Sequence, residues 1–142
     1  MLNDIITGIA KALGNTFGSE YRVYENDVKQ GLTEPCFFIA TLKPEQTPML
    51  GERALWRHPF DIHFFPKEPG TNEELYDVAE RLMLGLRYIR LPNGDLLRGL
   101  SVSYEAIDGV LHFFITYNMI VDIPKELPIM ETLDINAYPK KG

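Results

Sequence analysis

The chain has 142 residues, of which 45% are hydrophobic, 11% aromatic and 24% charged, and its net charge is −6 at pH 7. This composition excludes a disordered chain, and the length fits one domain with a substantial core. The 14 lysines and arginines are scattered apart from a pair at 140–141, so we expect no binding to the phosphate backbone and no sequence-specific nucleic-acid partner. No segment approaches the roughly 20 apolar residues that span a bilayer, and the amino end lacks signal-peptide features, so we expect a cytosolic protein without a membrane partner.

The amino-terminal part predicts a helix followed by a strand. Apolar residues in segment 3–17 recur at helical spacing on one face, and Gly18 suits a C-terminal cap. Residues 21–24 then have the pattern of a short strand.

The next two strands differ in their patterns. Residues 36–43 are apolar on both faces, which predicts a central strand covered on both sides. Residues 54–65 alternate, with Asp61 and His63 on the polar face. Pro59 has no N–H for a ladder, so we expect this second strand to be an edge strand or to be bulged there.

A second helix is predicted over residues 72–88. Thr71 and Glu74 form a capping box at its start. Its predicted core stripe is Leu75, Val78, Ala79, Leu82, Leu86 and Ile89. Arg87 and Arg90 are interpreted as cations that stabilise its C-terminal end.

A turn at 92–95 precedes a predicted hairpin. Its strands are 100–107 and 110–123, joined by Asp108 and Gly109, a strong hairpin signal. One face of the second strand is a continuous apolar row. The opposite face is mixed and is predicted to lie at an interface; it comprises His112, Phe114, Thr116, Asn118 and Ile120.

Two segments outside these elements are candidates for contact with other molecules. The connection 44–52 is longer than a hairpin normally needs, and Met49 and Leu50 favour a contact arm over a mobile connection with no partner. After a single domain at 1–123, prolines punctuate a tail at 124–142. In it, the apolar residues Met130, Leu133 and Ile135 predict an added strand that docks on its own domain or on a neighbouring copy.

The residues with reactive side chains predict no catalytic, cofactor or metal site. Cys36 lies in an apolar run, which indicates a buried thiol. His58 has the opposite strand parity to His63, and the register of His112 is not known from sequence, so an assembled metal site is not expected. Glycine-rich nucleotide loops and nucleophile elbows are absent from the sequence. We therefore predict a protein that acts through its surfaces and not as an enzyme.

The order of these segments resembles the tail terminator family of tailed phages and prophages of Gram-positive bacteria. The resemblance covers nearly the whole chain: the helix opening Asn3-Asp4-Ile5-Ile6, the strand Glu34-Pro35-Cys36-Phe37-Phe38-Ile39, the long loop, the strand with a polar face, the capped helix and the closing hairpin. It implies a single-domain α+β fold in which two main helices pack on a mixed or antiparallel sheet of about four to six strands.

The resemblance also implies a function in virion assembly. Such a protein assembles in the cytoplasm of the bacterial host as a homo-hexameric ring at the head-proximal end of the virion tail. There it caps the tail tube, stops its polymerisation and offers a surface to the head–tail connector protein, and an acidic lumen suits the passage of DNA. Its implied partners are copies of itself, the tail tube protein and the connector. The loop implied to contact the tube or a neighbouring copy is Gln46, Thr47, Pro48, Met49, Leu50, Gly51, Glu52 and Arg53.

Two alternatives belong to other classes of protein. A head–tail completion or connector protein of the same assembly has similar size and composition. A small-molecule-binding domain, or an unusual enzyme, would use a pocket between helix 72–88 and the sheet.

Overall fold

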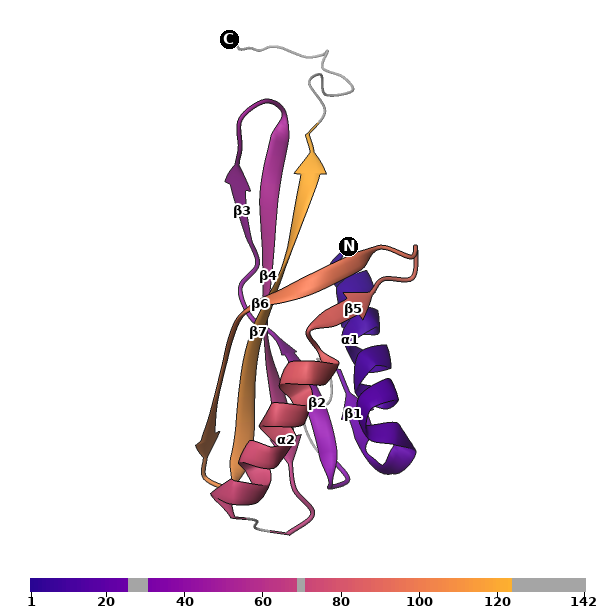
Figure 1. Cartoon of the computed structure of the whole chain (residues 1–142), viewed down its shortest axis with the longest axis vertical. Helices are drawn as coiled ribbons and strands as arrows, with labels where there is room; N and C mark the ends of the chain where they lie inside the picture. Colours follow the sequence, from indigo (N-terminus) through magenta and orange to yellow (C-terminus); the bar gives the residue numbers. More distant parts are fainter. Residues whose placement is uncertain (26–30, 69–70, 124–142) are drawn as a thin grey trace.

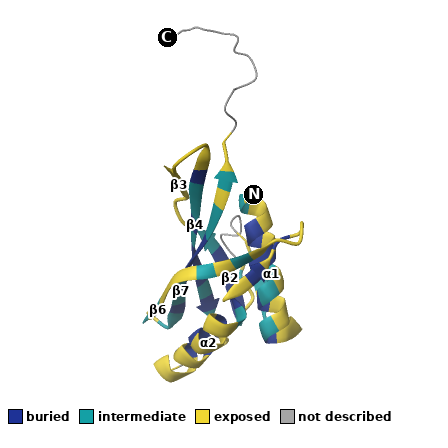
Figure 2. Ribbon diagram, turned by 45° about the horizontal axis from the view of Figure 1, so that its top comes forward, coloured by how far each residue is buried: buried dark blue, intermediate teal, exposed yellow. Residues whose placement is uncertain are grey.

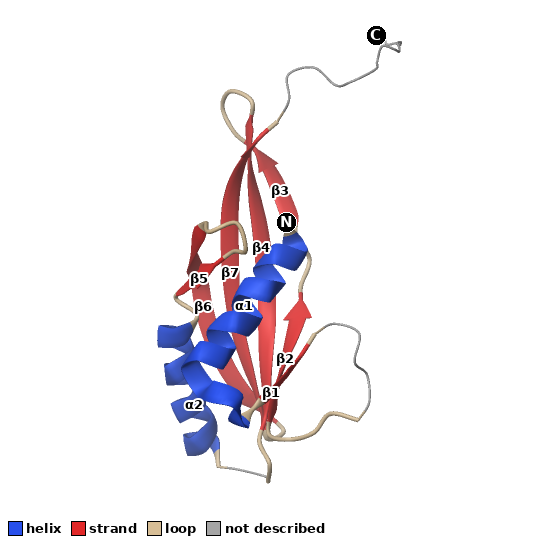
Figure 3. Cartoon of the chain, turned by 90° about the vertical axis from the view of Figure 1, so that its right-hand side faces the viewer, coloured by secondary structure: helices blue, strands red, loops and turns tan. Residues whose placement is uncertain are grey.

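The computed structural model describes residues 1–25, 31–68 and 71–123. In this part of the chain, two helices lie on one face of a curled, mixed sheet of seven strands (Figures 1 and 3). The elements are α1 Leu2–Phe17, the short 3-10 helix η1 Gly18–Glu20, β1 Arg22–Tyr24, β2 Cys36–Thr41, β3 Glu45–Pro48, β4 Arg53–Phe65, α2 Asn72–Gly85, β5 Tyr88–Arg90, β6 Leu96–Ile107 and β7 Val110–Asp122. The predicted single-domain α+β fold is confirmed. Neither described helix is long and apolar enough to cross a membrane.

The strand order is β1-β2-β4-β7-β6-β5, and β3 pairs with β4 outside this path. β1 and β2 are parallel, and the other pairs are antiparallel. The long ladder between β4 and β7, which runs from Arg53↔Asp122 to Phe64↔Leu111, is the spine of the sheet. It sets which side chains from distant parts of the sequence lie side by side.

β4 is an interior strand, so the prediction of an edge strand or bulge at Pro59 is wrong. β4 lies between β2 and β7, and Pro59 pairs in register with Thr116. The proline is tolerated because it faces the gap where β2 ends and β3 has not begun. There the Pro59 carbonyl accepts a hydrogen bond of 3.0 Å from the Leu42 N–H, so the proline still contributes its acceptor to the neighbouring segment of the chain.

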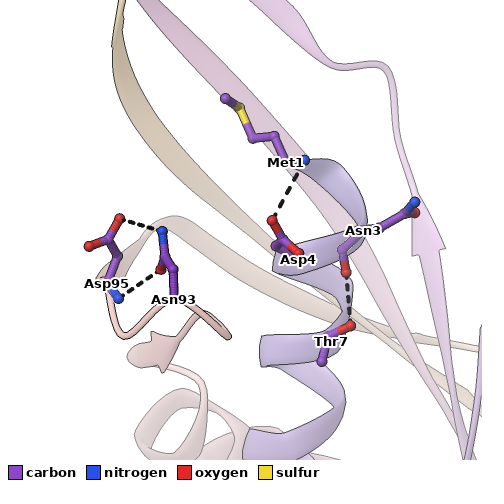
Figure 4. A network of polar contacts seen from close by, with 6 residues as sticks. All are labelled: Met1, Asn3, Asp4, Thr7, Asn93 and Asp95. Atoms are coloured by element: carbon purple, nitrogen blue, oxygen red, sulfur yellow. Dashed lines mark hydrogen bonds and ion pairs between the residues drawn. The ribbon is translucent and has the colours of Figure 1, made fainter.

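α1 packs on the sheet through one apolar stripe, as predicted. Its buried side chains include Ile5, Ile9 and Leu13, and Gly18 ends the helix at a φ of 76° that favours glycine. Figure 4 shows its first turn, where the terminal amine of Met1 lies 3.8 Å from the Asp4 carboxylate. This cation beside an exposed carboxylate contributes little to stability.

α2 begins as predicted but ends earlier. The Thr71 hydroxyl accepts a hydrogen bond of 3.3 Å from the Glu74 N–H, which confirms the cap. The helix stops at Gly85, and Tyr88–Arg90 form β5, so the assignment of Ile89 to the helix and of Arg87 and Arg90 to its end is wrong. A β-carbon at Gly85 would clash with Thr16, so α2 passes very close to α1 at its last residue.

The two predicted turns of the carboxyl-terminal half are confirmed. At 92–95, the Asp95 N–H donates a hydrogen bond of 2.9 Å to the Asn93 side chain (Figure 4). Between β6 and β7, Asp108 has φ 52° and Gly109 has φ 78°, the left-handed pair of a type I′ turn. β6 begins four residues earlier than predicted and is irregular between Leu100 and Ser103.

The core lies between the helices and the sheet. It contains an aromatic group in which Phe37 packs against Phe17 at 4.8 Å and against Phe64 at 5.0 Å between ring centroids. On the other side, the buried Tyr117 hydroxyl donates a hydrogen bond of 2.6 Å to the Leu86 carbonyl. This bond joins β7 to the residue that caps α2.

Candidate functional site

The predicted contact loop is mostly a β-hairpin. Residues Glu45–Pro48 form β3, which pairs with β4 from Glu45↔Arg57 to Pro48↔Ala54, so part of the connection 44–52 is strand and not loop. The turn itself is residues 49–52, closed by a hydrogen bond of 2.9 Å from the Met49 N–H to the Arg53 carbonyl. β3 forms because β4 offers it a free edge beyond the end of β2.

This hairpin and the end of β7 form an arm that extends beyond both helices (Figures 1 and 3). We define the arm as residues 45–57 and 118–123. Arg53 pairs with Asp122 at its end, and the Ile123 N–H bonds to the Glu52 carbonyl. At its tip, the Leu50 side chain is 93% exposed. Figure 2 shows that exposed and half-buried residues dominate this part of the molecule.

The sheet face opposite the helices is a second surface. No described helix covers it (Figure 3). Its side chains come from β2, β4 and β7 in register: Phe38 pairs with His63, which pairs with His112, and Asp61 pairs with Phe114. Phe38 and Phe114 are only half-buried, although Cys36 on the same side of β2 is buried. The prediction that β2 is covered on both faces therefore holds fully for the helix side and only at Cys36 on this side. We call this surface the open face.

Asp61, His63 and His112 form a cluster in the middle of the open face. The Asp61 Oδ2 atom lies 2.8 Å from His63 Nε2 and 3.0 Å from His112 Nδ1. The two imidazole rings lie 4.5 Å apart. The sequence did not predict this assembly, because His112 is brought to His63 only by the register of β4 against β7.

Asp61 is only 8% exposed, and two opposing effects act on the pKa of its carboxyl group. Burial raises its pKa, but the hydrogen bonds from His63 and His112, together with their charges, outweigh burial and hold the pKa below its ordinary value. The carboxylate is therefore ionised at neutral pH. Its second oxygen, Oδ1, is buried and has no hydrogen-bond partner among the described residues.

The chain matches the family described as phage tail terminator protein over residues 4–128. It belongs to the phage tail terminator family. The match spans the arm, the open face, α2 and most of α1, and confirms the predicted family; the Gram-positive origin stays a prediction. No curated protein matches the chain. Membership in a family of structural tail proteins makes this terminator a virion tail component whose partners are other tail and head components.

Two further predictions concern the tail and the single cysteine. Met130, Leu133 and Ile135 lie outside the described residues, so the tail contact stays a prediction. Cys36 is buried, as predicted, and burial together with the negative charge of Glu34 raises the pKa of its thiol.

His58 lies away from the cluster, on the helix side of β4. It is 3% exposed, and burial lowers the pKa of its imidazole, against a smaller opposing effect of a backbone hydrogen bond at Tyr117. The predicted difference in face between His58 and His63 is confirmed. In the terminator His58 is a core residue at the base of the arm.

The small-molecule alternative places a pocket between α2 and the sheet. A groove of about 520 Å³ lies between α2 and β6 and is open to solvent; it is lined by Tyr76, Glu80, Tyr104, Glu105 and Ala106. Leu75, Val78, Ala79 and Leu82 of α2 are buried in the core against the sheet. A second groove, of about 390 Å³, lies between α1 and β5, with Lys11, Tyr88 and Leu96 among its lining residues. It is open to solvent and lacks the enclosed shape of a typical small-molecule site.

Proposed function

We propose that the chain forms a hexameric ring at the head-proximal end of the tail tube, where it stops tube polymerisation and provides the surface that the head–tail connector binds. Family membership over residues 4–128 is the observation that carries this proposal. The ring assembles in the host cytoplasm and remains in the virion tail.

The tip of the arm binds the last ring of tube subunits. Leu50 is almost fully exposed and Met49 is partly exposed at a turn that extends past the domain. Exposing two large apolar side chains to water at the end of a hairpin costs free energy. Adjacent exposed apolar side chains of this kind are typical of surfaces that are buried on assembly. The paired strands β3 and β4 hold the tip in a defined position, so less ordering entropy is lost on binding.

The open face supplies the contact between neighbouring copies in the ring. It presents half-buried Phe38 and Phe114, and exposed Ile120 continues this face into the arm. A sheet face with aromatic side chains and no helix above it can bury apolar area against a second copy. This role agrees with the interface predicted for the mixed row of residues 112–120.

Termination then follows from shape alone. One side of the ring complements the tube end through the arms, while the other side lacks the surface that a further tube subunit needs. No covalent step is required, so the proposal assigns the protein a steric and templating mechanism.

Binding to tube ends tests the role of the arm. Preformed tubes of the tail tube protein from the same genome are mixed with the terminator, and capped ends are counted by negative-stain electron microscopy. The double variant Met49→Ser, Leu50→Ser should leave the melting temperature unchanged, because both side chains are exposed, and should cap far fewer ends. Leu84→Ser is the matched control, since Leu84 is 79% exposed on α2, away from the arm.

Equal capping by the wild type and the arm variant would reject the arm as the tube contact. Absence of the wild-type protein from tube ends, combined with binding to purified connector particles, would instead support the head–tail completion role.

A further inference from the structure

We propose that Asp61, His63 and His112 bind one zinc ion on the open face, through one carboxylate oxygen and two imidazole nitrogens. The inference rests on the geometry of these three residues and does not depend on the proposed function in the tail. It assigns a ligand to the cluster at the middle of the β4–β7 ladder.

The three ligand atoms already converge. His63 Nε2 and His112 Nδ1 lie 2.8 Å and 3.0 Å from the same carboxylate oxygen, and all the ligand atoms lie within 4.8 Å of one another. Tetrahedral zinc ligands bound at about 2.0–2.1 Å lie about 3.3 Å apart. Small side-chain rotations, with no change in the strand register, are enough to open the cluster around an ion.

Rigid strands hold all three ligands. His63 and His112 are directly paired across β4 and β7, and Asp61 is two residues from His63 on the same face. Sites built on strands keep their geometry better than sites on loops, so little order is lost when the ion binds. Phe38 and Phe65 contact the His63 ring, at 5.7 Å and 6.0 Å between centroids, and Phe114 stacks on His112 at 6.4 Å.

An independent observation also indicates a cation at this cluster. The Asp61 Oδ1 atom is buried and unpaired, although a buried polar oxygen normally has a partner. The His63 and His112 imidazoles contact only the other oxygen of this carboxylate, Oδ2. A divalent cation at the cluster would neutralise the carboxylate more fully than the two imidazoles do.

The ligand set selects the type of metal. Two imidazoles with one carboxylate suit zinc and related transition metals, whereas magnesium prefers oxygen ligands and keeps its water. Three protein ligands leave a position for water on the solvent side. A nitrogen that binds the ion cannot carry a proton. Each imidazole must therefore bind through the unprotonated nitrogen that faces Asp61 and carry its proton on the other ring nitrogen.

Calorimetric titration of the untagged, chelator-treated full chain with zinc tests the proposal. We expect one ion per chain with a micromolar or tighter dissociation constant, and no saturable heat with magnesium. His63→Asn, His112→Asn and Asp61→Asn should each weaken zinc binding by at least about tenfold, the lower end of the cost of losing even a supporting partner of a ligand. Asp77→Asn on α2 is the control, because it removes the same charge from an exposed position on another element.

A second measurement uses the wild type alone, in case a variant does not fold. The sequence has three histidines, so each ring can be followed by nuclear magnetic resonance. Zinc should shift the ring signals of His63 and His112 and leave those of His58 in place. The proposal is overturned if zinc gives no saturable binding, if the ligand variants bind like the wild type, or if the shifts fall outside the cluster.

Discussion

At the scale of single residues, Tyr117 joins the sheet to the end of α2. The side chain is buried in the core, and its hydroxyl donates to the Leu86 carbonyl at 2.6 Å. Burial raises the pKa of this phenol, so it is a neutral donor throughout the physiological range. The hydrogen bond satisfies a carbonyl that helix geometry leaves unpaired.

Removing this hydroxyl should be costly. Tyr117→Phe leaves the Leu86 carbonyl without its donor, so we expect the free energy of unfolding to fall by about 1–2 kcal/mol in a urea titration. Tyr76→Phe, at an exposed position of α2, should change it by less than about 0.5 kcal/mol. Equal effects of the two substitutions would contradict a structural role for the Tyr117 bond.

Burial of His58 should make part of the free energy of unfolding depend on pH. Because burial lowers its pKa in the folded state, the unfolded chain binds a proton more readily at this residue. The neutral ring therefore contributes stability above the unfolded pKa of about 6.5, and this contribution is lost as the pH falls through the folded pKa.

The unfolding free energies of the wild type and His58→Gln, measured in urea across this range, isolate that contribution. Their difference should shrink as the pH is lowered from neutrality, because only the wild type carries the buried imidazole. A difference that stays constant or grows on acidification would show that the His58 pKa is not lowered.

Sequence patterns place some of these residues but not others. The alternation of residues 54–65 correctly puts His58 on one face and His63 on the other, since side chains alternate along a strand. The pairing of His63 with His112 depends on a register between strands separated by the whole of α2. Local spacing does not contain that information, so the cluster becomes visible only in the fold.

At the scale of elements, Gly85 determines how α1 and α2 cross. Its missing side chain leaves room for Thr16, and Arg81 beside it donates to the Thr16 carbonyl at 3.1 Å and lies over the Phe17 ring. The helices can therefore approach closely near their carboxyl ends.

Two alanine substitutions distinguish the effect of the close helix contact on stability from the effect of helix propensity. Gly85→Ala should lower the unfolding free energy by about 1–3 kcal/mol, because the new methyl group clashes with Thr16. Gly14→Ala, in α1 with open space around it, should raise the unfolding free energy by about 0.5–1 kcal/mol. Chemical denaturation of both variants is the measurement, and stabilisation by Gly85→Ala would show that the contact is not tight.

The predictable elements are those with strong local signals. α1, the capped start of α2 and the β6–β7 turn follow from periodicity, a capping box and an Asp-Gly pair. β3 has no such signal, because Glu45–Pro48 is polar, exposed and ends in proline. It is a strand because β4 pairs with it, which is a tertiary effect.

For the whole molecule, the helices and the exposed surfaces lie in different regions. Both helices cover one face of the sheet, which leaves the open face and the arm available for contact (Figures 1 and 3). An acidic chain of this kind repels its own copies at long range, so a specific ring needs matched surfaces. The arm and the open face are the surfaces proposed here to supply that match.

Tail tube length is the most direct test of termination. The terminator is titrated into polymerising tail tube protein from the same genome, and tube lengths are measured by negative-stain electron microscopy. Tubes should become shorter as the terminator concentration rises, with a ring at one end, because each capped end stops adding subunits. Tube lengths that are independent of terminator concentration, with no added density at the ends, would contradict the proposed function.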